Sequence, residues 1–161
     1  LHVVPEFLGN RAPFADPHAR AAIVGLGMER DIDNLVALYI AGLCGIGYGL
    51  RQIIDAQAAA GAPIDKIVIS GGAGQLDLVR QLLADTTGKP LLATRAEEPV
   101  LLGAAILGSV AGGTFPDVRS AMAALSATDR TYQPAGGETT GLHARRYEAF
   151  RRLQDLAREL R

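Results

Sequence analysis

The clearest structural signal in the sequence lies at residues 66–74, which read Lys-Ile-Val-Ile-Ser-Gly-Gly-Ala-Gly. The apolar, β-branched run at 67–69 is typical of a short strand that is buried on both faces. Three glycines at 71–74 permit a sharp turn and let the backbone come close to a ligand. Leucine and valine then recur at helical spacing up to Gly88, which predicts a helix over about 75–87. The segment therefore predicts a strand, a glycine turn and a helix, the opening of a layered α/β arrangement.

A long helix is expected before this segment. It begins at an acidic cap, Asp31 or Asp33, and its apolar residues keep helical spacing to about Ala60. Glycine inside a helix weakens it by roughly 0.5–1 kcal/mol relative to alanine. This helix contains several, namely Gly42, Gly45, Gly47 and Gly49. Such a set predicts that another element packs very closely against the helix.

The remainder of the chain alternates short apolar runs with helical patterns. A second strand is expected at 91–93, an extended stretch at 132–134, and helices over about 97–112, 117–125 and 139–161. Residues 1–30 form an expected loop region with one short strand at 2–5. The order predicts an α/β fold with helices packed on a small, mainly parallel sheet. Because two or three strands do not complete a sheet, the chain, 1–161, is expected to be a single partial domain, the second half of a larger one.

Composition and charge narrow the classes of partner. The formal net charge is −1, so no general attraction to nucleic acid or to an acidic membrane is expected. The apolar residues 35–54 are interrupted by Tyr, Gly and Arg51, which favours a buried helix and no membrane span. The single cysteine, Cys44, has apolar neighbours. We interpret it as a packed thiol in a protein of a reducing compartment, the cytoplasm.

The glycine turn is the strongest candidate for binding chemistry. Free amides and the dipole at the start of the following helix suit anions or polar rings. A dinucleotide fingerprint would need a third glycine where Asp77 stands, and a phosphate loop would need Gly-Lys followed by Ser or Thr. Neither pattern is met. From the residues alone, a ligand-binding turn and a plain turn without a ligand both stay open.

Two further sequence patterns are weaker candidates for a ligand-binding or metal-binding site. Glu97 and Glu98 precede Pro99 at an expected helix start, where acids either contact a ligand or simply stabilise the helix. The histidines at positions 2, 18 and 143 show no metal-ligand spacing. No metal site is therefore expected in this chain.

Several motifs in series resemble the C-terminal domain of the FGGY carbohydrate kinases. They are the opening stretch at 4–20, Ser70-Gly71-Gly72, the run at 81–88, and Glu97 with Gly103-Ala104-Ala105. Together they cover essentially the whole chain in the correct order, and residues 9–13 look closest to the ribulokinase and ribitol kinase branch. The resemblance implies an actin-like, ribonuclease-H-like fold in which two domains flank a cleft.

The resemblance also implies transfer of the γ-phosphate of ATP, with Mg²⁺, to a sugar or polyol such as D-ribulose or ribitol. Carried over, Gly71, Gly72 and Ala73 would line the nucleotide. Leu76 would stand near the adenine, where family members often have Asn or Ser. The family's phosphate loop and catalytic Asp precede the matched region. The chain is therefore expected to hold no catalytic residue and to be inert without an N-terminal, sugar-binding domain.

Two other functions stay open at this point. One is a non-catalytic actin-like module that binds a nucleotide or a partner, and the other is a dinucleotide-binding domain, which the absent third glycine disfavours. An apolar surface is expected where further strands would pair, so the isolated chain is expected to dimerise, swap or aggregate.

Overall fold

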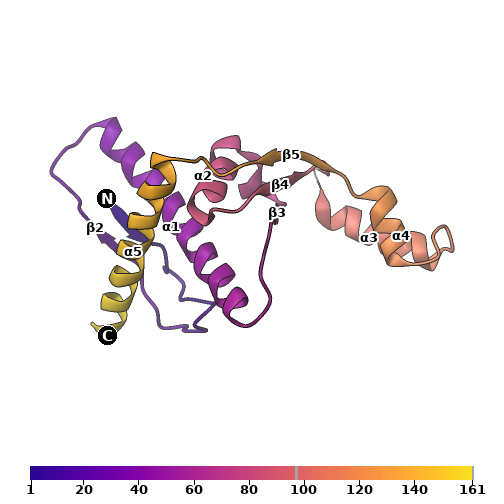
Figure 1. Cartoon of the computed structure of the whole chain (residues 1–161), viewed down its shortest axis with the longest axis horizontal. Helices are drawn as coiled ribbons and strands as arrows, with labels where there is room; N and C mark the ends of the chain where they lie inside the picture. The colour runs from indigo at the N-terminus through magenta and orange to yellow at the C-terminus, as the bar shows by residue number, and fades with distance from the viewer. Residues whose placement is uncertain (97, 161) are drawn as a thin grey trace.

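The computed structural model describes residues 1–96 and 98–160. In chain order the elements are β1 (His2–Val4), β2 (Ala22–Val24), α1 (Ile32–Ala59), β3 (Ile67–Ile69), the 3₁₀ helix η1 (Gly72–Gln75), α2 (Asp77–Thr87), β4 (Leu91–Thr94), α3 (Pro99–Ala111), α4 (Val118–Leu125), β5 (Thr128–Tyr132) and α5 (Glu138–Glu159). Helices α3 and α4, called the arm below, project from the other elements, called the body (Figure 1).

Helix α1 organises the body. Its N-cap is Asp31, whose Oδ1 accepts a hydrogen bond from the backbone N–H of Asn34 at 2.9 Å, so the expected acidic cap is confirmed. The helix packs against β1, α2 and α5. Gly61, with φ of +85°, turns the chain away after its last residues. Helix α1 is long and apolar enough to cross a membrane, but the core helix of a soluble protein passes the same test of length and composition.

Two glycines of α1 are sites of close approach. The backbone carbonyl of Val3 in β1 lies over Gly45, and a Cβ added there would overlap it. At Gly47 an added Cβ would overlap the hydroxyl of Thr86 in α2 and would lie 2.8 Å from its Cβ. Close packing against this helix is therefore confirmed at these positions. An added Cβ at the other two glycines, by contrast, would meet no atom within 4 Å.

The strands form two small sheets rather than one. Strands β3 and β4 pair in parallel, and β5 pairs antiparallel with β4, with an irregular register between Leu92 and Thr94. Strands β1 and β2 form a separate antiparallel pair. The α/β class with helices on a small sheet is confirmed, but the sheet is mixed instead of mainly parallel. The difference is β5, whose first four residues are exposed and therefore lack the apolar alternation that marks a half-buried strand.

Helix α5 closes the body by packing against β1 and α2 as well as α1. Its residues Tyr147 and Phe150 form a core cluster with Val4, Cys44 and Tyr48. A second cluster lies between α2 and the three-stranded sheet, and comprises Leu83, Ala84, Leu91, Ala93 and Tyr132. The body is thus held by two apolar clusters, and α1 and α2 both contribute side chains to each of them.

A buried polar chain joins α5 to the opening loop. Gln154 is 1% exposed, and its Nε2 donates to Oε1 of Glu6 at 2.6 Å. Its Oε1 accepts from Nε2 of Gln52 in α1 at 2.7 Å. Glu6 also accepts from the side-chain amide of Asn10 at 2.5 Å. Buried polar atoms that find partners in this way cost little to bury, and they fix the opening loop on the two helices.

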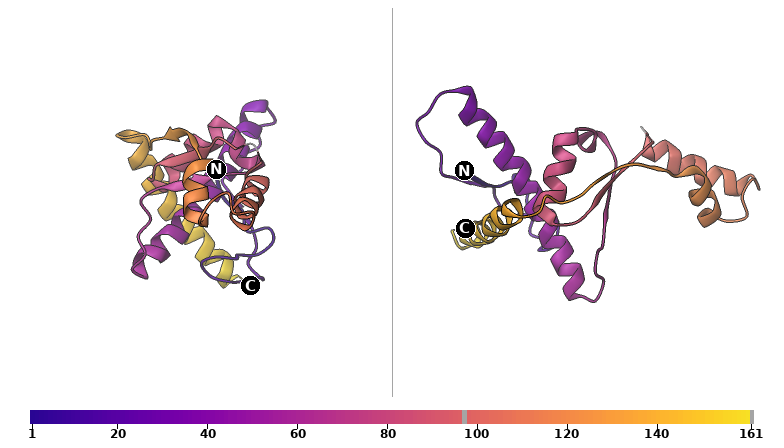
Figure 2. Two further views of the ribbon diagram at one scale, coloured as in Figure 1. Left: turned by 90° about the vertical axis from the view of Figure 1, so that its right-hand side faces the viewer. Right: turned by 45° about the horizontal axis from the view of Figure 1, so that its top comes forward.

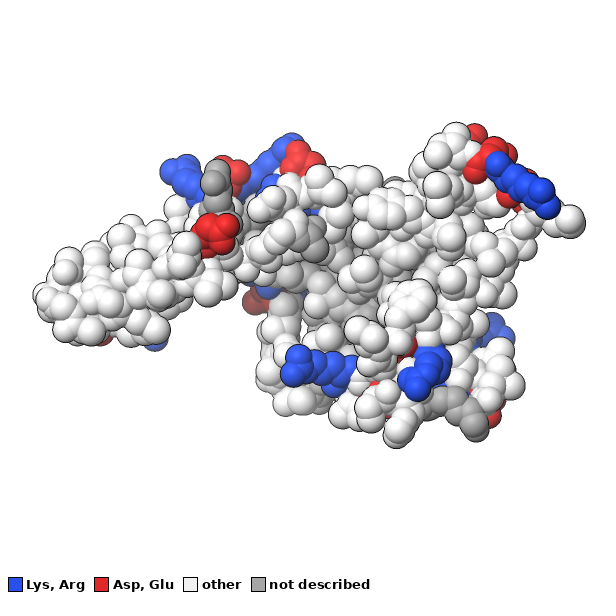
Figure 3. Space-filling model, turned by 180° about the vertical axis from the view of Figure 1, so that it is seen from behind, with Lys and Arg blue, Asp and Glu red and all other residues white. Residues whose placement is uncertain are grey.

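The arm differs from the body in its packing. Helices α3 and α4 pack against each other, and the right-hand view of Figure 2 shows them standing apart from the body. Its large apolar side chains are widely exposed, for example Val100 at 82% and Leu101 at 67%. Seen from behind, the surface of the arm is nearly free of charged side chains (Figure 3). The arm is therefore a projecting helical hairpin with an apolar surface.

Candidate functional site

A polar cavity opens where β3 and β4 end. Its volume is about 380 Å³, and residues of five segments line it: Ile69, Ser70, Gly71, Gln75, Arg80, Thr94, Arg95, Ala96, Glu98 and Asp129. Most of these residues carry hydrogen-bonding or charged side chains. Ligands of open α/β sheets bind at the carboxyl ends of the parallel strands, which is where this cavity lies. It is therefore the candidate site.

The backbone after β3 is shaped to leave space. Gly71 has φ of +92°, a conformation that residues with side chains rarely adopt. The next residues form the 3₁₀ helix η1, and α2 begins at Asp77, so the simple glycine turn and a helix from 75 are corrected. A Cβ added to Gly71 or Gly72 would meet no atom within 4 Å. The protein itself does not fill the space beside these glycines, and a ligand has room to approach the backbone there.

The residues predicted to line a nucleotide fall in different places. Gly71 lines the cavity, and Gly72 is exposed at the start of η1. The backbone of Ala73 also belongs to η1. Leu76 is 58% exposed and lines a separate apolar cavity with Tyr39, Ile46 and Leu83 among others, so it lies outside the lining of the polar cavity. Glu97 lies outside the described residues.

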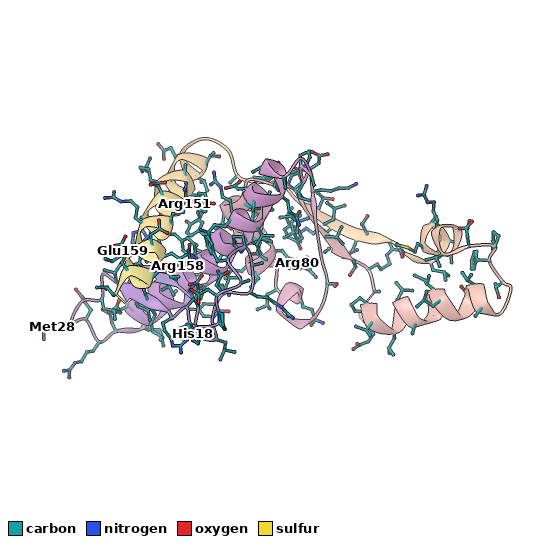
Figure 4. The ribbon with its side chains drawn as sticks, turned by 90° about the horizontal axis from the view of Figure 1, so that it is seen from below. His18, Met28, Arg80, Arg151, Arg158 and Glu159 are labelled. Atoms are coloured by element: carbon teal, nitrogen blue, oxygen red, sulfur yellow. The ribbon has the colours of Figure 1, made fainter. Side chains whose placement is uncertain are left out.

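Four side chains beside the cavity tie β5 to the start of α2. The hydroxyl of Tyr132 donates to Oδ1 of Asp77 at 2.5 Å and accepts from Nη1 of Arg80 at 3.1 Å. Nη1 of Arg130 donates to Oδ2 of Asp77 at 2.9 Å. The hydrogen bond from Tyr132, followed by the charges of Arg130 and Arg80, holds the pKa of Asp77 below its ordinary value. Arg80, which also lines the cavity, lies on the side of the body next to the arm (Figure 4).

Sequence reasoning named Glu98 as a candidate ligand contact, and Glu98 lines the cavity, but it missed the other charged side chains there. Arg80 comes from α2, Arg95 follows β4, and Asp129 comes from β5, so no short spacing marks them as one site. The only local signal was the i, i+3 pair of Asp77 and Arg80 on the first turn of a helix that follows the glycines. The pairing of β4 with β3 brings Arg95 to the cavity, and the pairing of β5 with β4 brings Asp129 there.

A second polar group lies in the core between α1 and α5. The hydroxyl of Tyr48 and Nδ1 of His143 are 2.8 Å apart, and both residues are buried. Burial lowers the pKa of His143, raises the pKa of Tyr48 to about 12 and raises the pKa of the Cys44 thiol. Cys44 is therefore confirmed as a buried thiol. Within residues 1–96 and 98–160, no group of three or more His, Cys, Asp or Glu residues is arranged to hold a metal ion.

Comparison with known proteins gives consistent relatives. An FGGY carbohydrate kinase domain-containing protein of Xenopus laevis is 36% identical over 159 residues, which are 99% of this chain and 29% of that protein. A D-ribulokinase of Saccharomyces cerevisiae is 37% identical over 115 residues, 71% of this chain and 16% of that protein. The crystal structure of a xylulose kinase from Rhodospirillum rubrum matches with a TM-score of 0.79 at 21% identity, covering 99% of this chain and 31% of that one.

The structural match confirms the expected actin-like fold. The chain spans less than a third of the length of each of these relatives. Residues 1–112 match the model of the FGGY family of carbohydrate kinases, C-terminal domain. On that match, which extends from the opening loop through the glycine segment to the end of α3, the chain belongs to the FGGY family of carbohydrate kinases.

Proposed function

We propose that this chain is the nucleotide-binding portion of an ATP-dependent carbohydrate kinase. The observation that carries the proposal is the polar cavity at the carboxyl ends of β3 and β4, beside glycines whose missing side chains leave open space. Family membership supplies the reaction class, phosphoryl transfer to a sugar or polyol hydroxyl. Membership and cavity together favour the adenosine part of ATP as the occupant.

The lining suits a nucleotide in its chemistry. Ser70, Gln75 and Thr94 offer hydrogen bonds to ribose hydroxyls or to ring nitrogens, and the Gly71 backbone lets a flat ring come close. Arg80 and Arg95 offer cationic groups, while Glu98 and Asp129 accept from donors. ATP would supply the transferable phosphoryl group. Because the resemblance implies that the family's phosphate loop and catalytic Asp precede the matched region, we assign no metal ligand and no catalytic residue to this chain.

The acceptor that we propose is a pentulose or polyol such as D-ribulose or ribitol. Support comes from the yeast D-ribulokinase, which matches 71% of the chain at 37% identity. Relatives named for glycerol and xylulose also match, at 31% identity over most of the chain and by fold respectively. An assay with ATP and a panel of pentuloses and pentitols decides among these acceptors.

The proposed partners follow from the same reasoning. Relatives are more than three times as long as the matched region, so we propose that a sugar-binding and catalytic domain completes the cleft in the same protein. Nucleic acid and membrane surfaces are not proposed as partners, because the net charge of −1 gives no general attraction to either. The buried, unpaired thiol of Cys44 supports a cytoplasmic location.

Nucleotide binding is tested by titrating the 161-residue chain with ADP and with NAD in a calorimeter. We expect ADP to bind and NAD to bind more weakly. Gly72→Ala should weaken ADP binding while leaving the melting temperature almost unchanged, because its added Cβ meets only open space in the protein. Gly103→Ala on α3, which also meets open space, is the matched control and should bind ADP normally. Preference for NAD, or equal loss in both variants, would overturn the assignment.

Phosphoryl transfer is tested separately with ATP and a panel of pentuloses and pentitols. We expect no turnover above background from the 161-residue chain, because the resemblance implies that the family's phosphate loop and catalytic Asp precede the matched region. Turnover of any acceptor would show that the chain carries catalytic groups that we do not assign.

A further inference from the structure

Tyr132 occupies an unusual place in the body. Its ring belongs to the apolar cluster between α2 and the sheet, and the residue is only 5% exposed. Its hydroxyl nevertheless reaches two charged groups of α2, the carboxylate of Asp77 and the guanidinium of Arg80. Two arginine side chains flank the same ring, with the guanidinium carbons of Arg80 and Arg130 5.7 Å and 5.1 Å from its centroid. One side chain therefore connects the antiparallel strand β5 to the first turn of α2.

One partner of the Tyr132 hydroxyl lines the candidate site, and the other lies next to its glycine segment. Asp77 is the first residue of α2, and only Leu76 separates it from η1, so a shift of Asp77 displaces the glycine segment. Arg80 lines the polar cavity, and its side chain is only 17% exposed. Because an arginine side chain has many rotamers, a hydrogen bond that fixes its guanidinium reduces the entropy lost when a ligand binds.

We propose that Tyr132 is a positioning residue for the polar cavity: through Asp77 and Arg80 it holds residues 70–76 and the Arg80 guanidinium in the arrangement that receives the nucleotide. The expected effect of Tyr132 on nucleotide affinity rests on the proposed function. The expected effect of Tyr132 on the position of residues 70–76 is independent of it. Arg80 is the member of the network that contacts the ligand, whereas Tyr132 and Asp77 act through it and through the backbone.

The chain offers a matched control for this inference. Tyr147 on α5 is 8% exposed, its hydroxyl donates to Oδ2 of Asp55 at 2.8 Å, and the guanidinium carbon of Arg51 lies 4.3 Å from its ring centroid. It reproduces the buried ring, the carboxylate acceptor and the flanking arginine of Tyr132. It does not line the polar cavity or touch the glycine segment. Removing the hydroxyl of Tyr147 therefore measures the loss of folding stability without altering the polar cavity.

The experiment compares Tyr132→Phe with Tyr147→Phe in the 161-residue chain. Each variant keeps the ring and loses one hydroxyl bonded to a carboxylate, so both should lower the melting temperature by similar amounts. We expect Tyr132→Phe to weaken ADP binding about tenfold, as the loss of one hydrogen bond to a charged group allows. Tyr147→Phe should leave the dissociation constant for ADP within about twofold. Equal weakening in both variants would overturn the positioning role.

Amide hydrogen exchange supplies a readout that needs no ligand. We expect Tyr132→Phe to speed exchange in residues 70–76 and Tyr147→Phe to leave that segment unchanged. If the unmodified chain binds no ADP, the proposed function fails, but this comparison still decides whether Tyr132 positions the glycine segment. Unchanged exchange at 70–76 in Tyr132→Phe would refute the inference, whatever the nucleotide result.

Discussion

The body and the arm are both mainly helical, yet they are held together in opposite ways. In the body, β1 approaches Gly45 and α2 approaches Gly47 so closely that neither leaves room for a methyl group, and the buried side chain of Gln154 bonds to both Gln52 and Glu6. In the arm, α3 and α4 touch chiefly each other, and glycines such as Gly108 face open space. The body thus contains the contacts that specify its shape. The arm exposes an apolar surface that no part of the described chain covers.

Adding one methyl group should have opposite effects in the body and in the arm. Gly47→Ala should lower the free energy of unfolding by about 1–3 kcal/mol, because the new Cβ overlaps Thr86 in a packed interface. Gly108→Ala in α3 should instead raise helix stability by up to about 1 kcal/mol, since alanine is the better helix former. Chemical denaturation followed by circular dichroism measures both. Similar responses in body and arm would contradict the distinction.

The exposed arm should also control self-association. Large apolar patches on a soluble chain favour contact with a second apolar surface. Replacing Leu101 and Leu107, 67% and 61% exposed, by glutamine should weaken self-association severalfold in sedimentation velocity runs. Leu8→Gln provides the control, because Leu8 is 99% exposed but lies on the opening loop of the body. A wild-type chain that stays monomeric at high concentration would be the contrary result.

The folding stability of the body should also depend on pH, with a smaller effect than the substitutions above. Burial lowers the pKa of His143, so the folded body prefers the neutral imidazole. The unfolded chain takes up its proton first as the pH falls below the ordinary value of 6.5, and stability should therefore decline from about pH 6.5 downward and stay flat above it. His143→Gln should flatten this decline, as followed by melting temperatures between pH 5 and 8. His2, whose pKa is also lowered, shifts stability in the same direction and needs its own variant, His2→Gln.

Sequence predicted the elements whose signals are local. The cap at Asp31, the existence of a strand at 67–69 and the close approach to two glycines of α1 were readable, because each depends on residues within a few positions or on glycine itself. The burial predicted for that strand was wrong, since Val68 is 58% exposed on the sheet. Strands β2 and β5 were missed, since their residues are largely exposed and follow no apolar alternation. Their formation depends on pairing partners elsewhere in the chain.

The same reason explains the partial success at the site. Gly71 was found because a run of glycines directly after a β-branched strand is a signal within a few residues, and its φ of +92° is a conformation that favours glycine. Arg80 and Tyr132 were not, because their 3.1 Å contact joins positions 52 residues apart and exists only once β5 lies beside β4. Residues that meet through sheet pairing escape any reasoning confined to short spacing.

The hydrogen bond between Gln154 and Glu6 limits how early the body can close during synthesis. The two residues are 148 positions apart, and the first is synthesised long before the second. Helix α5 also supplies Tyr147 and Phe150 to the cluster that buries Val4 of β1. While the ribosome is still translating the middle of the chain, β1 and the opening loop therefore lack the helix that covers them. The body can close only late in synthesis, and folding through such distant contacts is slow, so the nascent opening segment is the part with most need of a chaperone.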